Sequence, residues 1–314
     1  MSETNKLIID LIKQDYSLRE IAEILKITEK QLYIRIKQII NQGYQLYPNY
    51  RCDSEIYYKI LYGKQENYTF SISMPKKEQT FRCIVISDLH IGNINSDIKL
   101  LDYVYEYATK NGINYVFVCG DNVEGDYTVD RKYIKNVYDQ VEELIKKYPY
   151  DKNINNVMIY GNHDHHSLKE EGFNASQKIK NARYDIIPIG YGQGTVNIKN
   201  DNLILFHKLN ESTSPVISND EKLILSGHGH MMKTKIKEQL WLCVPTLSYV
   251  SVDKTVDVIP GFIDLTLDFS KGKFDFLGAK HIIITPKLIT INETRCKMKI
   301  FENINLDEVD KGKK

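Results

Sequence analysis

Short apolar runs alternate with amphipathic stretches from residue 81 onward. Three of the runs are rich in β-branched and aromatic residues, which is typical of strands buried on both faces: "FRCIVIS" (81–87), "NYVFVCG" (114–120) and "NNVMIYG" (155–161). The segments between them, 96–112 and 132–149, have apolar residues at helical spacing. Ser96 is the expected N-cap of the first of these helices, and Gly112 is its expected end. This alternation predicts an α/β fold that begins with strand-helix units.

The later pattern favours strands over helices. Seven segments between residues 185 and 269 are apolar or alternate between apolar and polar residues, as strands of a mixed or antiparallel sheet do. Residues 276–314 predict additional strands followed by a polar tail. We therefore place the main α/β domain at residues 81–275 and a separate C-terminal segment at residues 276–314.

The first 45 residues predict helices only. Ser17 with Glu20, and Thr28 with Gln31, have the spacing of two capping boxes, each placed before a short amphipathic helix. A third helix precedes this pair. Two capped helices joined by a tight turn form the skeleton of a helix-turn-helix module. It resembles the winged variety, although Lys26 stands in the turn where such modules usually have glycine.

Residues 46–80 are rich in tyrosine and predict a β wing followed by a polar linker. The tyrosines suit a small sheet or, alternatively, stacking on unpaired bases. The second capped helix carries Lys30, Arg35 and Lys37 against one acidic residue, Glu29, and these three are our candidate nucleic-acid-binding residues. The alternative is a helical cap or a homodimerisation element that contacts no DNA.

Composition limits the classes of function. The formal net charge is +1, so nucleic-acid binding would have to be local rather than driven by a global basic field. No apolar run approaches the length of a membrane span, and the first residues lack the pattern of a signal peptide. The five cysteines are scattered and never form Cys-x-x-Cys, which favours free thiols in a reducing cytosol. We expect a cytoplasmic protein with no membrane partner.

Polar clusters follow the apolar runs. Five of the eight histidines lie just beyond a predicted strand, next to carboxylates or an amide; the cluster residues are Asp88, His90, Asp121, Glu124, Asn162, His163, His207, His228 and His230. Functional groups in α/β sheets collect beyond the carboxyl ends of strands. A set of carboxylates, imidazoles and one amide suits a pair of divalent transition-metal ions such as Mn, Fe or Zn.

The order D-x-H, G-D, G-N-H-D, H and G-H-x-H resembles the calcineurin-like metallophosphoesterase superfamily, including its DNA-repair exonuclease branch, over roughly residues 81–275. The resemblance implies a four-layer α-β-β-α sandwich, here with a small N-terminal helix-turn-helix domain. It implies two metal positions that share Asp121. The first would take Asp88, His90, Asp121 and His230, and the second would take Asp121, Asn162, His207 and His228.

The resemblance also implies roles in catalysis. A hydroxide shared by the metals would attack phosphorus, and His163 would assist the leaving group, with Glu124 orienting it. Among the neighbouring residues, we expect Asp164 to bind backbone amides of its turn. His165 and His166 would be exposed loop residues or, alternatively, would line the substrate cleft.

The substrate is less constrained. The arginine that protein phosphatases carry after G-D-x-x-D is absent, which lowers that class. The N-terminal module favours a metal-dependent nuclease or phosphodiesterase acting on DNA or RNA, with Mn as the first choice of metal. One alternative is a small-nucleotide or cyclic-nucleotide phosphodiesterase that uses the module for dimerisation. Another is a non-enzymatic DNA-binding regulator with a sensing metal site.

Overall fold

The computed structural model describes most of the chain between residues 2 and 297. The described ranges are 2–41, 44–50, 56–64, 69–75, 77–126, 131–165, 175–210, 213–217, 221–236, 239–251, 258–285 and 287–297. Within them, no helix is long and apolar enough to cross a membrane.

The N-terminal unit contains three helices and a hairpin: α1 (Glu3–Lys13), α2 (Leu18–Leu25), α3 (Glu29–Asn41), β1 (Tyr44–Tyr50) and β2 (Ile56–Lys64). Both predicted capping boxes are confirmed. Ser17 Oγ accepts from the Glu20 amide at 3.2 Å, and Thr28 Oγ1 accepts from the Gln31 amide at 3.2 Å. Lys26 ends α2 with a φ of 52°, the left-handed conformation that favours glycine, so lysine keeps the turn at some cost in strain.

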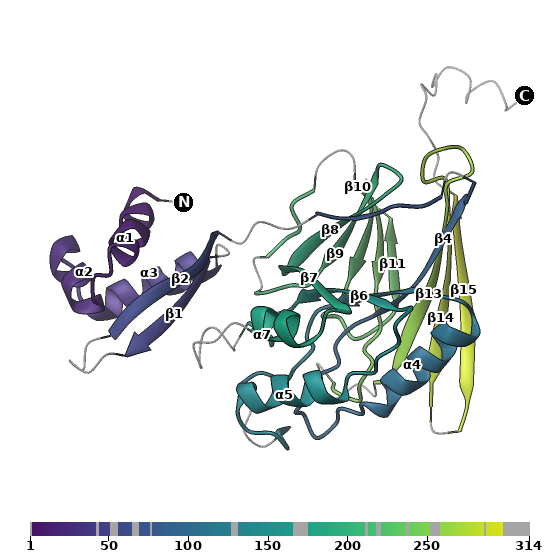
Figure 1. Cartoon of the computed structure of the whole chain (residues 1–314), viewed down its shortest axis with the longest axis horizontal. Coiled ribbons are helices and arrows are strands. Elements are labelled where there is room, and N and C mark those ends of the chain that lie inside the picture. Colours follow the sequence, from purple (N-terminus) through teal and green to yellow (C-terminus); the bar gives the residue numbers. More distant parts are fainter. Residues whose placement is uncertain are drawn as a thin grey trace, which may run out of the picture.

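This unit has a hydrophobic core of its own. Buried residues of the three helices pack with Leu46 of β1 and Tyr58 of β2, and among the residues that the structure describes none beyond the hairpin belongs to this cluster. Figure 1 shows the unit beside the larger body.

The larger body is a sandwich of two mixed sheets. The first, in spatial order, contains β15 (Ile289–Lys297), β14 (Phe276–Ile284), β13 (Gly261–Asp268), β4 (Thr80–Ile86), β5 (Tyr115–Cys119), β6 (Asn155–Tyr160) and β7 (Ile186–Tyr191). The second contains β11 (Lys233–Ile236), β12 (Leu240–Cys243), β10 (Glu221–Ser226), β9 (Asp201–Phe206), β8 (Gln193–Ile198) and β3 (Thr69–Ile72). The sheets therefore include strands on both sides of residues 81–275.

Each of the two sheets contains a block of parallel strands. Strands β4 to β7 pair in parallel, as do β9, β10 and β12. Strand β13 runs antiparallel to β4 and β14, and β8 runs antiparallel to β9 but parallel to β3. A buried cluster that includes Val85, Phe117, Leu205 and Leu225 fills the space between the sheets. The predicted α/β sandwich is confirmed.

Three helices cover the outer face of the seven-stranded sheet: α4 (Lys99–Lys110), α5 (Val137–Lys147) and α7 (Ala175–Ala182). In the part of the chain that the structure describes, the helices of the sandwich lie on this sheet. Gly112 ends α4 as predicted, with a φ of 65°. Ser96 is not its cap, since its hydroxyl donates to the Leu89 carbonyl at 2.9 Å.

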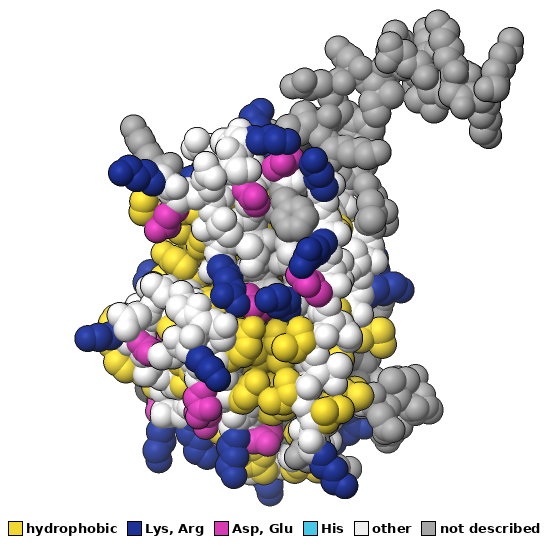
Figure 2. Space-filling model, turned by 90° about the vertical axis from the view of Figure 1, so that its right-hand side faces the viewer, with side chains coloured by type: hydrophobic (Ala, Val, Ile, Leu, Met, Phe, Trp, Pro, Cys, Tyr) yellow, Lys and Arg dark blue, Asp and Glu magenta, His cyan; other side chains and the backbone are white. Residues whose placement is uncertain are grey.

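The edge strand β15 is mostly exposed. Its apolar residues Ile289 and Ile291 are 46% and 56% exposed. On the side of the molecule that Figure 2 shows, hydrophobic side chains gather below charged ones. Buried polar side chains such as Asp88 and His207 lie elsewhere, after the carboxyl ends of the parallel strands.

Candidate metal centre

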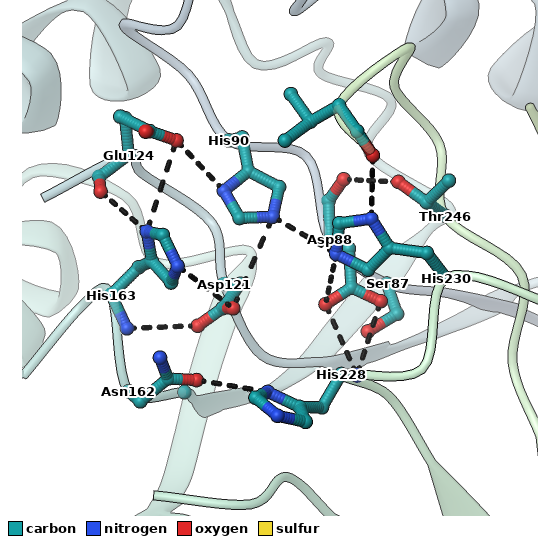
Figure 3. A network of polar contacts seen from close by, with 12 residues as sticks. Ser87, Asp88, His90, Asp121, Glu124, Asn162, His163, His228, His230 and Thr246 are labelled. Carbon is teal, nitrogen blue, oxygen red and sulfur yellow. Dashed lines mark hydrogen bonds and ion pairs between the residues drawn. The ribbon is translucent and has the colours of Figure 1, made fainter. Parts of the chain in front are cut away.

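The carboxyl ends of five parallel strands meet at one place between the sheets. Asp88 and His90 follow β4, Asp121 and Glu124 follow β5, and Asn162 and His163 follow β6. His207 follows β9, and His228 and His230 follow β10. The structure therefore brings together all nine candidate metal and catalytic residues that the sequence indicated. Figure 3 labels all of them except His207.

The ligand atoms fall into two groups around Asp121. Asp88, His90 and His230 have ligand atoms within 4.8 Å of one another, and so do Asp121, His207 and His228. The Asp121 carboxylate lies between the groups, with Oδ2 3.1 Å from His207 Nε2 and 4.0 Å from His90 Nε2.

Asn162 completes the second group. Its Oδ1 lies 3.1 Å from His207 Nε2 and 3.1 Å from His228 Nδ1. A third set, in which His163 joins His90 and Asp121, overlaps both groups. The structure thus brings Asp88, His90 and His230 together on one side, and Asp121, Asn162, His207 and His228 on the other.

Hydrogen bonds orient the imidazoles so that ring nitrogens without a proton point inward. His207 Nδ1 donates to the Cys119 carbonyl at 2.6 Å, and His230 Nδ1 donates to the Val250 carbonyl at 2.6 Å. A carbonyl can only accept, so Nδ1 holds the proton, and Nε2 of the neutral ring presents a lone pair. His90 is held in the same way by Glu124 Oε2, 3.0 Å from its Nδ1.

This arrangement fits a cation. His90 Nε2 and His230 Nε2 lie 3.2 Å apart, and His207 Nε2 lies at 3.1 Å from the Asn162 oxygen, so electron-donating atoms face each other in a buried place. Such contacts are repulsive unless a proton or a metal ion lies between them. Nitrogen, carboxylate and amide donors are those that Mn, Fe and Zn accept.

Without a metal, protonation of ligand residues offsets part of this repulsion. Burial lowers the pKa of His207, but the charges of Asp121 and Asp88 outweigh burial and raise that pKa to about 9. Burial raises the pKa of Asp121, but His207, His163 and His90 hold it well below its usual range. Burial lowers the pKa of both His228 and His230. The site therefore keeps its carboxylate ionised and ready to bind a cation.

The backbone at the site is strained where ligands leave the strands. Five ligand residues have the left-handed φ that non-glycine residues rarely adopt, between 49° and 71°: Asp88, His90, Asp121, His228 and His230. Close approach also demands glycine. A Cβ at Gly227 would lie 2.1 Å from Ser87 Oγ and 2.4 Å from the Cys119 carbonyl.

His163 lies beside the two groups rather than within either. Its ring centroid is 4.5 Å from that of His90, and its Nε2 is 3.9 Å from Asp121 Oδ2. Its Nδ1 donates to the backbone carbonyl of Glu124 at 2.6 Å. The Glu124 carboxylate is 3.8 Å from that nitrogen and bonds His90 instead, so Glu124 contacts both histidines through different atoms.

The residues that follow His163 in the histidine-rich turn have structural contacts. Asp164 accepts from the amides of Asn122, Val123 and Gly161, which confirms its expected role. Burial and the charge of Asp121 raise its pKa to about 7 despite these bonds. His165 is buried against Tyr191, so its expected exposure is wrong. His166 lies outside the described residues.

Three groups that support the site were not found from the sequence. Thr246 Oγ1 donates to the Asp88 carbonyl at 2.8 Å, and Ser87 Oγ donates to the Cys119 carbonyl at 3.0 Å. The third is the Val250 carbonyl that holds His230. Serine, threonine and a backbone oxygen carry no local signal of such a role, although the stretch "PTLS" after β12 marks a polar turn.

A two-sheet α/β sandwich with carboxylates, imidazoles and an amide at its strand ends defines the class of metal-dependent phosphoesterases. Residues 81–247 match the family described as the calcineurin-like phosphoesterase superfamily domain, and the chain belongs to that superfamily. No curated protein matches the sequence.

Solved structures with a similar fold include two Vps29 proteins and a nuclease. Vps29 from Cryptosporidium parvum is 18% identical, covers 70% of this chain and 100% of its own, and has a TM-score of 0.43. Zinc-complexed Vps29 from Entamoeba histolytica is 13% identical, with 68% and 99% covered and a TM-score of 0.42. The Pseudomonas putida nuclease MPE is 17% identical, with 58% and 84% covered and a TM-score of 0.32.

Proposed function

We propose that this chain is a dinuclear-metal-dependent phosphodiesterase that cuts nucleic acid, with DNA as the favoured substrate and Mn as the favoured metal over Fe and Zn. The position of Asp121 carries the proposal, because one carboxylate lies between two separate groups of nitrogen and oxygen ligands. When bound there, two divalent ions would supply an activated water and neutralise charge on the phosphoryl oxygens.

His163 is the proposed proton donor to the leaving oxygen. Because its Nδ1–H is committed to the Glu124 carbonyl, Nε2 has a proton to give only when the ring is positively charged. Burial lowers the pKa of His163, while the Asp121 and Glu124 carboxylates oppose this change. A phosphate bound next to the ring would add negative charge and favour the charged form further.

The N-terminal unit is the proposed nucleic-acid interface. Lys30 and Lys37 on α3 are exposed, and Arg35 is half-buried. A groove of about 290 Å³ runs along this helix, lined by Ile27, Gln31, Ile34, Arg35 and Gln38. Amide and guanidinium groups beside an apolar side chain are the chemistry that recognises base edges and thymine methyl groups in a major groove.

A small-nucleotide phosphodiesterase is the second candidate. It is favoured by Ile24 and Ile34, which are 47% and 51% exposed on the same unit. Exposed apolar residues of this size suit contact with a second copy of the chain, which would leave the unit a role in dimerisation.

The test uses the full chain with added Mn²⁺ and two variants, His163→Ala and His281→Ala. His281 lies in β14 outside the site, so its variant is the matched control. Labelled single- and double-stranded DNA and RNA are assayed beside bis-p-nitrophenyl phosphate and cyclic nucleotides. We expect polymer cleavage that falls by roughly 10²–10⁴-fold in His163→Ala and persists in His281→Ala.

Two other results would reject the proposal. Hydrolysis of cyclic nucleotides without polymer cleavage would favour the small-nucleotide enzyme. No hydrolysis with Mn, Fe or Zn, together with retained DNA binding, would favour a regulator.

A further inference from the structure

Three exposed apolar side chains lie in loops around the first ligand group: Ile94 and Met231 in loops that carry its ligands, and Tyr249 in the loop whose Val250 carbonyl contacts His230. Ile94 is 58% exposed, Met231 is 55% exposed and Tyr249 is 38% exposed. Met231 directly follows the ligand His230, and Ile94 is the fourth residue after His90. Exposed apolar groups next to an otherwise charged site are typical of a ligand-binding surface.

Hydrogen bonds tie these loops to one another and to the ligands. The Tyr249 amide donates to the Asn95 carbonyl at 2.9 Å, which joins its loop to the one that carries Ile94. The next residue, Val250, accepts from His230 Nδ1 at 2.6 Å. The backbone of Tyr249 is therefore held in place, and the next residue, Val250, contacts the candidate metal-binding residue His230.

The residues next to the second ligand group differ. Lys208 follows His207, and Gly229 follows His228. Tyr133 is also exposed and its amide donates to the Gly92 carbonyl; burial, and then the charge of Glu143 on α5, raise its pKa.

We propose that Tyr249, together with Ile94 and Met231, forms a platform on which the nucleobase next to the cleaved phosphate stacks. The inference deepens the proposed phosphodiesterase function and rests on it. Every base presents a π-face to an aromatic ring, and aliphatic and thioether groups pack against the same face. The platform is continuous with the metal centre through the residues that hold His230.

The platform also orients the substrate. In Figure 3, His163 and His230 lie on opposite sides of His90. If His163 serves the leaving oxygen, the stacked base belongs to the nucleoside that keeps the phosphate. The enzyme would then prefer diesters of nucleosides over diesters of simple alcohols with the same leaving group.

Two substrates separate stacking from chemistry: thymidine 5′-(p-nitrophenyl phosphate) and methyl p-nitrophenyl phosphate, which release the same phenolate. We expect the full Mn-loaded chain to prefer the thymidine ester, and Tyr249→Ala to reduce the ratio of the two kcat/KM values about tenfold. Tyr249→Phe should keep the ratio, since the ring remains. Tyr184→Ala removes an exposed tyrosine on another surface and should leave the ratio unchanged.

An unchanged ratio in Tyr249→Ala overturns the platform, as does an equal loss on both esters. If the wild type cleaves neither ester, the phosphodiesterase proposal has failed, and calorimetric binding still decides the platform. Thymidine 5′-monophosphate should then bind more tightly than methyl phosphate to the wild type, and equally weakly to Tyr249→Ala. Equal binding of both phosphates to the wild type overturns the platform.

Discussion

The metal centre and helix α3 both concentrate charged residues, but they do so in opposite environments. Asp88 and His207 are fully buried, and each is held by several hydrogen bonds or ion pairs. Lys30 and Lys37 on α3 are exposed to solvent. A buried charge costs several kcal/mol unless it is compensated, whereas an exposed charge costs almost nothing.

This difference decides how far each region identifies its function. The buried cluster would be an energetic liability without a cation, so its geometry defines a metal site. The charges on α3 would be tolerated in any soluble helix, so only an experiment can connect them to nucleic acid.

The largest effect should come from Asp121→Asn. This change removes the charge that both ligand groups share, so we expect kcat/KM for bis-p-nitrophenyl phosphate to fall by roughly a thousandfold or more. Asp139→Asn alters an exposed carboxylate on α5 and should have no such effect. Comparable losses in both variants would mean that Asp121 has no special place in the reaction.

Glu124→Gln should act through His90. The amide keeps the shape of the side chain but weakens the bond that orients His90, so we expect Mn²⁺ affinity to fall by roughly 10–100-fold. Raised Mn²⁺ should rescue activity in part, which titration of activity against metal concentration would measure. If kcat stays low even at saturating Mn²⁺, Glu124 acts through His163 and not through metal binding by His90.

Gly227→Ala should destabilise the sandwich, because its Cβ would meet Ser87 and the Cys119 carbonyl at 2.1 and 2.4 Å. We expect the free energy of unfolding to fall by about 1–3 kcal/mol, measured by urea denaturation. Gly229→Ala, two residues away with nothing within 4 Å, is the matched control and should change it by less than about 0.5 kcal/mol. Equal effects of the two changes would be inconsistent with the close approach.

Replacing Lys30, Arg35 and Lys37 together by alanine should weaken DNA binding and leave bis-p-nitrophenyl phosphate hydrolysis intact. The slope of log affinity against log salt should become shallower by about 2–3, because each phosphate contact contributes about one unit. A triple change of Lys6, Lys13 and Arg19, which are exposed on α1 and α2, should leave the slope unchanged. If both triples behave alike, the positive charges act without a defined interface.

The smallest effect should be on acid sensitivity. All eight histidines lie beyond residue 80, so titration near pH 6 acts on the sandwich and not on the N-terminal unit. Burial lowers the pKa of His281, whose Nε2 has no hydrogen-bond partner. The unfolded chain therefore binds a proton near pH 6.5 that the folded protein resists, and the free energy of unfolding falls as the pH drops through that value.

His281→Leu should remove this contribution, so that urea denaturation at pH 7.5 and 5.5 differs less than in the wild type. A variant as sensitive to acid as the wild type would assign the effect to the histidines of the metal centre.

Local features of this protein were predictable from its sequence alone. The capping boxes at Ser17 and Thr28, the buried strands that precede Asp88 and Asp121, and the types of metal ligand all depend on residues a few positions apart. Backbone propensity, side-chain capping and apolar periodicity act over that range, so the chain carries these signals continuously.

Tertiary structure alone decided which partner each group meets. Glu124 contacts His90, which is 34 residues away in the sequence, and Thr246 donates to the carbonyl of Asp88, 158 residues away. Strand β3 pairs with β8, although β4 to β7 lie between them in the sequence. Ser96 failed as a cap because the Leu89 carbonyl competes for its hydroxyl. These choices depend on how two sheets pack, and packing is settled by the burial of the whole core, which no short stretch of sequence contains.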